Sequence, residues 1–418
     1  MKVIILILSI FTWTHSWSSE PITLEGVTEK VSKNNYKVLE QAQKLYQAKK
    51  KISLMRANLL PRLNLWKLLN IPTIIMNPWM AANIATDIAP FLVPSNWFNV
   101  RKSKWNYKAS REQYRALWAN ELQHARGLFY SLSRDKYLLQ LVEQILTEYE
   151  FILAFAENRN AMGVDAPYIL DFVNSKYLKV KEDRRTLADL IYEEEKILLF
   201  HLGIKVDEKT EIKPVTFPDI SSIPPVNSEL IVEKSLIASP ELKQFKFLLA
   251  SLKNAKSSIY FSILGTSHFS RMAGNGVYDD IPVQNGLGFG MGPSIKISKS
   301  KEKQLSIRKK ATLETVKLQS LTATKKFNSS IDGYANAQAQ RASAKRAYKL
   351  MIDSMSLGDI TPPDKMIAVL NNSFSAQIFF LGYQFDFLRE LDTLKRLTFT
   401  PPFSLRSSEL DDVLRRAK

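Results

Sequence analysis

Apolar residues recur along the middle of the chain in alternating steps of four and three, and this spacing constrains the fold more than any other feature of the sequence. The stripe runs through Trp118, Leu122, Ala125, Phe129 and Leu132. A register one residue earlier then takes over, at Leu138, Val142, Ile145, Tyr149, Ile152 and Ala156. Such steps place side chains on one face of an α-helix and drive helices to pack lengthwise, as in coiled coils. The drift is expected because 3.6 residues per turn does not divide seven.

This pattern predicts helices too long for a compact domain. We expect one helix from near Ser110 to Asn160, about 50 residues or roughly 75 Å at 1.5 Å per residue. A break follows at Gly163, and a second helix then runs to about His201. Helices this long and narrow cannot bury their stripes in a single compact core. They are expected to pack against each other and against other chains.

The later part of the chain repeats this plan. A short helix, a polar break and a longer helix begin at Ile22 and again at Ser228, and the later breaks pair as Gly163 with Gly358. Two long helices follow in the second half as well, from about Lys301 to Met355 and from about Asp364 to Leu397. We therefore expect two structural repeats, residues 19–213 and 231–400, joined by a Pro- and Ser-rich linker at 214–230 and followed by a C-terminal tail at 401–418.

The N-terminus has the pattern of a cleaved export signal. Lys2 precedes an apolar run from Val3 to Trp13, and Ser16 and Ser18 supply the small residues that a signal peptidase needs. The run is too short to span a bilayer as a helix. We expect residues 1–18 to be a signal peptide and the chain to be exported without a transmembrane helix.

Composition excludes several classes of site. The chain has no Cys, so it has no disulfide, zinc–thiolate site, cysteine nucleophile or lipid attached through an N-terminal cysteine. His124, His201 and His268 lie far apart in sequence and lack the spacing of metal ligands. The net charge of +17 fits nucleic acid, an anionic membrane surface or acidic substrates. Because the Lys and Arg are spread along helices with Glu among them, and no basic run is interleaved with aromatic residues, we expect a solvated basic surface and no nucleic-acid partner. Contact with anionic cargo or with lipopolysaccharide stays open. No catalytic motif is present, and we expect no catalytic residues, no cofactor, no metal and no enzymatic activity.

Each half also contains a segment that does not have the helical pattern. Residues 287–298 alternate between apolar and small or polar positions. This alternation fits a strand of a lipid-facing, water-lined β-barrel and equally a half-buried hairpin in a soluble sheet. In the first half, Pro72, Pro78, Pro90 and Pro94 interrupt apolar stretches, and proline removes ladder hydrogen bonds. We expect β-regions at about 62–100 and about 258–298, the first less regular than the second.

In their order, these stretches resemble the TolC-type outer-membrane efflux protein family. The resemblance is carried in both repeats by ITLEGV, NNYKVL and ANLLPRLNL, by APFLVPSNWFNVRKSKWNYKASREQYRALW, and by two hairpin tips, GVDAPYILDFVNS and GDITPPDKMIAV. It implies a mainly α fold with a β-barrel portion. Long antiparallel helical hairpins would form a trimeric α-barrel in the periplasm, and each chain would give four strands to a shared transmembrane β-barrel.

The resemblance also implies a function. The homotrimer would be the outer-membrane channel of a tripartite efflux or type I secretion system, a passive exit duct to the exterior. Its partners would be a periplasmic adaptor protein, an inner-membrane pump or secretion ATPase, and outer-membrane lipid. A second hypothesis, prompted by the prolines of the first β-region, is a periplasmic helical scaffold with a degenerate barrel and no channel activity.

The resemblance places a gate and a docking surface at the hairpin tips. On the returning helices, Asp171 and Asn174 follow the first tip, and Asp364 and Ile367 follow the second. Three copies of Asp364 would form an acidic ring selective for cations, although an acid at a helix start is also explained by capping. No counterpart of the family's arginine links at the first tip is expected. The tip residues expected to contact an adaptor are Gly163, Val164, Asp165, Ala166, Gly358, Asp359, Ile360 and Thr361.

Overall fold

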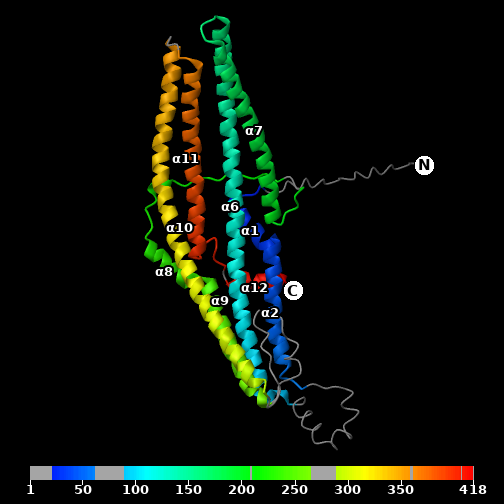
Figure 1. Ribbon diagram of the computed structural model, residues 1–418. Coiled ribbons are helices and arrows are strands. Elements are labelled where there is room, and N and C mark those ends of the chain that lie inside the picture. The colour runs from blue at the N-terminus through cyan, green and yellow to red at the C-terminus, as the bar shows by residue number, and fades with distance from the viewer. Residues whose placement is uncertain are drawn as a thin grey trace, which may run out of the picture.

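The part of the chain that the structure describes is almost wholly helical and drawn out along one axis (Figure 1). The computed structural model describes residues 21–61, 89–207, 210–264, 289–357, 361–405 and 407–417. The predicted signal peptide and the centres of both predicted β-regions, 62–88 and 265–288, lie outside the described residues. Among the described helices, none is both long and apolar enough to cross a membrane.

The helices of the two halves match one to one. The first half contains α1 (Leu24–Asn34), α2 (Tyr36–Ala57), α6 (Pro94–Ala161) and α7 (Pro167–His201), of 11, 22, 68 and 35 residues. The second half contains α8 (Ser228–Ala238), α9 (Pro240–Tyr260), α10 (Met291–Ser356) and α11 (Pro363–Leu397), of 11, 21, 66 and 35 residues. Three short 3-10 helices also occur, η1 (Pro90–Leu92), η2 (Ile220–Ser222) and η3 (Phe261–Leu264).

Local signals explain where these helices begin. The Thr23 hydroxyl accepts a hydrogen bond from the Gly26 N–H at the start of α1 (3.1 Å), and Asn35 Oδ1 accepts one from the Val38 N–H at the start of α2 (3.0 Å). Ser239 caps α9 in the same way, at the equivalent polar break of the second half. Helices α6, α7, α9 and α11 carry proline in their first turn, where its missing N–H costs no hydrogen bond.

Both long helices begin earlier than expected, which corrects the described ends of the predicted β-regions. Residues 94–100 belong to α6, residues 291–298 belong to α10, and residues 259–264 belong to α9 and η3. Met291 and Ile295 lie one turn apart and pack near Leu305 against Leu252 and Ile259 of α9. The alternation that we interpreted as a strand therefore also fits one face of a helix.

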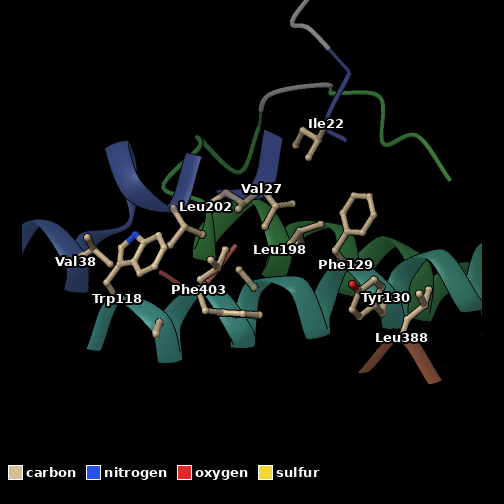
Figure 2. Close-up of a cluster of buried hydrophobic side chains, with 14 of the residues drawn as sticks. Ile22, Val27, Val38, Trp118, Phe129, Tyr130, Leu198, Leu202, Leu388 and Phe403 are labelled. Atoms are coloured by element: carbon tan, nitrogen blue, oxygen red, sulfur yellow. The ribbon is translucent and has the colours of Figure 1, made fainter. Parts of the chain in front are cut away.

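The predicted apolar stripe is confirmed as the buried face of α6. Trp118, Leu122 and Phe129 lie in a large core cluster formed with α1, α2, the end of α7 and α11 (Figure 2). The register from Val142 to Ala156 is buried as well, nearer the far end of the helix. The apolar stripe of α6, whose register shifts by one residue, therefore packs into two separate hydrophobic clusters along the helix.

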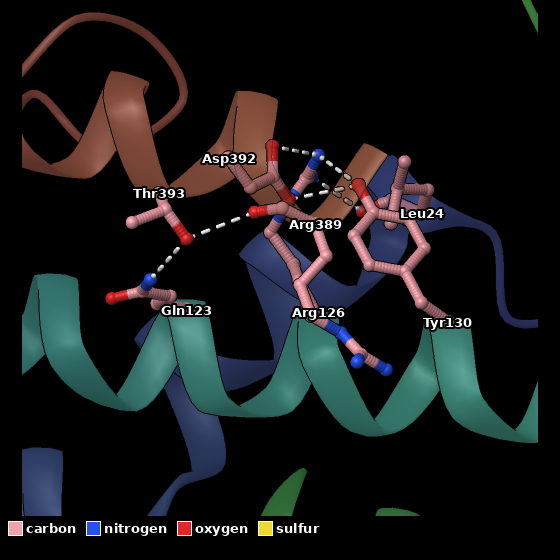
Figure 3. Close-up of polar contacts among 7 residues, drawn as sticks. All are labelled: Leu24, Gln123, Arg126, Tyr130, Arg389, Asp392 and Thr393. Carbon is pink, nitrogen blue, oxygen red and sulfur yellow. Dashed lines mark hydrogen bonds and ion pairs between the residues drawn. The ribbon is translucent and has the colours of Figure 1, made fainter. Parts of the chain in front are cut away.

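A polar cluster lies inside the larger core (Figure 3). The Arg126 guanidinium donates from Nε to Asp392 Oδ2 (2.6 Å) and from Nη2 to Asp392 Oδ1 (3.0 Å). The Tyr130 hydroxyl donates to Asp392 Oδ2 (2.8 Å) and accepts from Arg126 Nη2 (3.0 Å). Arg126 also reaches the carbonyl of Leu24 (3.5 Å). These contacts join α6, α11 and the start of α1.

The segment expected to be a C-terminal tail is an ordered part of the core. Helix α12 (Ser407–Arg416) packs on α2. Leu410 and Leu414 are buried together with Phe403 in the large cluster. The apolar residues of this segment recur at steps of three and four, a spacing that predicts an amphipathic helix and could have identified α12 from the sequence. The N-terminal end is held by a parallel bridge between Ile22 and Ile212.

Candidate functional site at the helical tips

The first tip is a tight reversal between α6 and α7. Gly163 adopts φ +67°, in the left-handed region. The Gly163 N–H donates to the Asn160 carbonyl (3.0 Å) and the Val164 N–H to the Arg159 carbonyl (3.1 Å), which is the Schellman arrangement that ends helices at glycine. Gly163, Val164 and Ala166 are exposed, as predicted for the tip.

Asp165 does not present a free carboxylate. Arg159 holds it with two hydrogen bonds, from Nε to Oδ2 (2.5 Å) and from Nη2 to Oδ1 (2.7 Å). The hydrogen bonds from Arg159 lower the pKa of the Asp165 carboxyl. Arg159 and Asp165 belong to the same turn, so this pair does not bear on the expectation that the family's arginine links have no counterpart at this tip. The Asp165 carboxylate closes the turn.

The predicted gate residues of the returning helix are exposed. Asp171 and Asn174 lie three residues apart on α7 and face solvent in the single chain. Asp171 is beyond the first turn of a helix that starts at Pro167. Capping, which favours an acid within the first turn, therefore does not explain it.

The second tip separates its two predicted gate residues. Gly358, Asp359 and Ile360 lie outside the described residues, and Thr361 is half-buried. Asp364 is exposed in the first turn of α11. Ile367 is only 2% exposed, so the prediction that it lines a constriction is corrected: its side chain is in the core of the single chain.

Ile367 belongs to the cluster that holds the two hairpins together. Met366, Ile367 and Leu370 of α11 pack against the far part of α6 and against Val173 of α7. Polar pairs reinforce this contact: the Tyr149 hydroxyl donates to Asn371 Oδ1 (2.9 Å) and the Tyr348 hydroxyl donates to Glu148. The helices next to the tips are thus packed together, and the acids Asp171 and Asp364 are the candidate functional groups on them.

Two histidines away from the tips lie closer together than the sequence indicated. His124 and His201, expected to lie apart, are in contact, with ring centroids 4.5 Å apart, because α7 folds back along α6. Burial lowers the pKa of His201, and the neighbouring His124 adds to this effect. Among the described residues, no three His, Cys, Asp or Glu side chains gather as a metal site would require.

Solved structures share this architecture over nearly the whole chain. No protein-family model and no curated protein sequence matches it. The fold resembles a membrane protein from Pseudomonas aeruginosa (TM-score 0.70, 14% identity, 94% of each chain covered). It also resembles the Campylobacter jejuni CmeC outer membrane channel (0.69, 14%, 98% of this chain and 94% of that one) and the open state of the Neisseria gonorrhoeae MtrE outer membrane channel (0.67, 11%, 90% and 89%). At these identities the likeness shows the fold, and it confirms the predicted architecture of long helical hairpins.

Proposed function

We propose that the chain is one subunit of an outer-membrane channel that serves a tripartite efflux or type I secretion system. The observation that carries the proposal is the pair of matching hairpin units on a fold shared, nearly end to end, with solved outer membrane channels. Helix α6 alone, at 68 residues, extends roughly 100 Å at 1.5 Å per residue. That length fits a duct across a periplasm.

The single chain supports the proposal of a homotrimer. Near one end of the molecule the described helices pack in the order α2, α6, α9 and α10, so α2 and α10 are the outer pair of this row. A row of this kind closes into a ring when copies repeat around an axis. The predicted barrel strands, four per chain, belong to the same proposal, and the residues on which they fall lie outside those described.

The proposed gate is the set of exposed acids at the tips. Asp364 and Asp171 are both exposed in the single chain, and a ring of charge requires the other copies. Three Asp364 side chains around an axis would attract cations and repel one another. The exposed tip residues Gly163, Val164 and Ala166 remain the proposed docking surface for an adaptor, together with the second tip.

The test is a bilayer measurement on the full chain purified from the outer-membrane fraction. We expect a heat-modifiable trimer that conducts, and Asp364→Ala should weaken cation preference or cation block. Asp183→Ala, which removes an exposed acid farther along α7, is the matched control and should leave selectivity unchanged. Recovery only as a soluble periplasmic monomer would overturn the proposal.

The same bilayer experiment distinguishes the channel from the alternative hypothesis of a periplasmic helical scaffold. It is motivated by the four prolines of the first predicted β-region. It requires a trimer or monomer that never conducts in planar bilayers, and Asp364→Ala would then change only stability.

A further inference from the structure

The positive charge of this chain is concentrated at one end of the molecule, which corrects the expectation of an even spread without interleaved aromatic residues: Trp105 lies between Lys104 and Lys108. Four helical segments hold 21 of its Lys and Arg against a single acid, Glu302: five in 41–61, five in 89–111, four in 242–264 and seven in 289–313. The rest of the chain has 37 Lys and Arg against 40 Asp and Glu. These segments are the end of α2, the start of α6, the end of α9 and the start of α10, which lie together at the lower end of Figure 1. We call them the cationic band.

On α6 the band forms one stripe. Trp97, Arg101, Lys104 and Lys108 are exposed at steps of four, three and four, so they share one face of the helix. Lys108 Nζ lies over the ring of Trp105 (4.2 Å) and over that of Phe247 on α9 (5.9 Å). The stripe therefore continues onto α9 along one side of the helical layer.

The contacts of α9 show which side this is. Ser251 and Ser258 donate to backbone carbonyls of α6, whereas Leu252 and Ile259 pack towards α10. At about 100° per residue, the directions of these two neighbouring helices are about 100° apart, so the arc between them on the other side of α9 is about 260° wide. The exposed Lys246 and Lys253 lie in the middle of that wide arc. In a closed ring of helices the wide arc faces outwards, so the cationic side is the outer wall.

Apolar and aromatic side chains are exposed beside the band, at the extreme end of the same helices. Phe91 and Leu92 lie in η1, Trp97 lies near the start of α6 and is 49% exposed, and Tyr260 and Phe289 lie at the end of α9 and just before α10. Aromatic residues next to Lys and Arg are typical of positions where a protein meets lipid headgroups. A soluble polyanion would match the charge but would leave these apolar side chains in water.

We infer that the cationic band is a binding surface for anionic phospholipid headgroups, placed on the outer wall of the duct where it meets the membrane. The inference rests on the proposed channel function for its placement at the membrane end. The phosphate and net negative charge of the lipid pair with Arg101, Lys104, Lys253 and their neighbours, while Phe91, Leu92 and Trp97 reach the acyl boundary. The band thereby anchors a chain that has no cysteine for a lipid anchor.

Native mass spectrometry of the full chain, purified in detergent and offered equimolar phosphatidylglycerol and phosphatidylethanolamine, tests the inference. We expect preferential retention of phosphatidylglycerol. The triple variant Arg101→Glu, Lys104→Glu and Lys108→Glu should lower that preference at least about ten-fold, given the strength of single Lys or Arg contacts with anionic membrane surfaces. The matched control Lys179→Glu, Lys345→Glu and Lys349→Glu makes the same change of net charge at exposed positions outside the band and should retain it.

Other outcomes overturn the inference. Equal retention of both lipids by the wild type would do so, as would an unchanged preference in a band variant whose circular dichroism shows normal folding. If heparin, a soluble polyanion, bound the chain more tightly than either lipid without displacing bound lipid, the band would be assigned to a polymer. A switch of ion selectivity in the band variant, with lipid preference intact, would place the band in the lumen. A trimer that conducts but shows no lipid preference would refute the lipid-binding inference and leave the channel function standing. A chain that shows the lipid preference but does not conduct would refute the channel function and leave lipid binding standing.

Discussion

Asp392 is the residue on which the centre of the molecule depends most. Its side chain is 5% exposed and that of Arg126 is 9% exposed, and Tyr130 completes the cluster. Removing one partner of a buried ion pair leaves the other charge buried and uncompensated, which costs about 3–5 kcal/mol. We expect Asp392→Ala to lower the free energy of unfolding by about that amount, measured by urea denaturation followed by circular dichroism.

Two comparisons separate this effect from a generic loss of charge. The double variant Arg126→Met, Asp392→Leu removes both charges and should recover most of the lost stability, since an apolar pair packs without a desolvation penalty. Glu182→Ala breaks an exposed pair with Arg185 and should change nothing measurable. A double variant no more stable than Asp392→Ala would show that the pair itself is not the source of the cost.

The surroundings of Glu194 predict how the stability of the chain depends on pH. Burial, followed by the negative charge of the neighbouring Asp135, raises the pKa of Glu194 to about 7, and Arg134 opposes the shift. The folded chain therefore binds more protons than the unfolded chain between about pH 4.5 and about pH 7. The stability that protonated Glu194 contributes is present below that window and is lost as the pH rises through it.

Glu194→Gln keeps the neutral form at every pH. We expect its thermal unfolding midpoint to exceed that of the wild type at about pH 8 and to converge with it near pH 5. Glu193→Gln, at the exposed neighbouring position, is the control and should follow the wild-type profile. Parallel curves for Glu194→Gln and the wild type would mean that another group titrates in this window.

At the scale of the helix, two glycines that end helices in the same way differ in what surrounds them. Gly163 has φ +67°, and a Cβ at this position would meet no atom within 4 Å. At Gly203, with φ +68°, a Cβ would lie 2.1 Å from the Asn34 carbonyl oxygen. Gly163→Ala should therefore cost only the left-handed strain, about 1–2 kcal/mol. Gly203→Ala should cost about 1–3 kcal/mol more, because overpacking adds to the strain.

A third glycine provides the control for this comparison. Gly127 lies within α6 with nothing within 4 Å of the place a Cβ would take, so Gly127→Ala should raise stability by about 0.5–1 kcal/mol. Denaturant midpoints of the three variants test the ranking. Equal losses at Gly163 and Gly203 would show that the close approach of Asn34 relaxes without cost.

Local signals made the helix plan predictable. The break at Gly163, the end of α7 at His201 and the end of α11 at Leu397 lie next to Gly or Pro residues, which act within one turn. The Arg159–Asp165 link was also readable, since opposite charges six residues apart flank the turn glycine. The starts of α6 and α10 were missed because their apolar spacing fits a strand and a helix alike.

Contacts between distant helices were not predictable in this way. Ile367 appeared free to line a gate because only its spacing from Gly358 was visible, and its burial depends on α6 residues more than 200 positions away. The contact of His124 with His201 and the docking of α12 have the same origin. Spacing in the sequence identifies the face of a helix, whereas the neighbour of that face is decided by how the hairpins associate.

At the scale of the whole molecule, α10 retains an apolar face that a single chain does not cover. Its inner face, which includes Val316 and Phe327, is buried against the rest of the chain. The exposed apolar residues of the opposite side, which share one face at about 100° per residue, are Ile307, Leu318, Leu321 and Leu350. Because Leu318 is 66% exposed on a helix at the edge of the layer, a second copy of the chain is the occupant that the proposed trimer supplies.

Leu318→Lys combined with Leu321→Lys should therefore convert most of the trimer to monomer, since charges buried in an interface without partners are strongly unfavourable. Size-exclusion chromatography with light scattering in detergent measures the change. Leu318→Ala with Leu321→Ala should weaken the trimer less, because it removes apolar area without adding charge. Gln319→Lys, an exposed neighbour off this face, should leave the trimer intact. If the lysine variant stayed as trimeric as the wild type, this face of α10 would lie outside the subunit interface, and the ring would close through other helices.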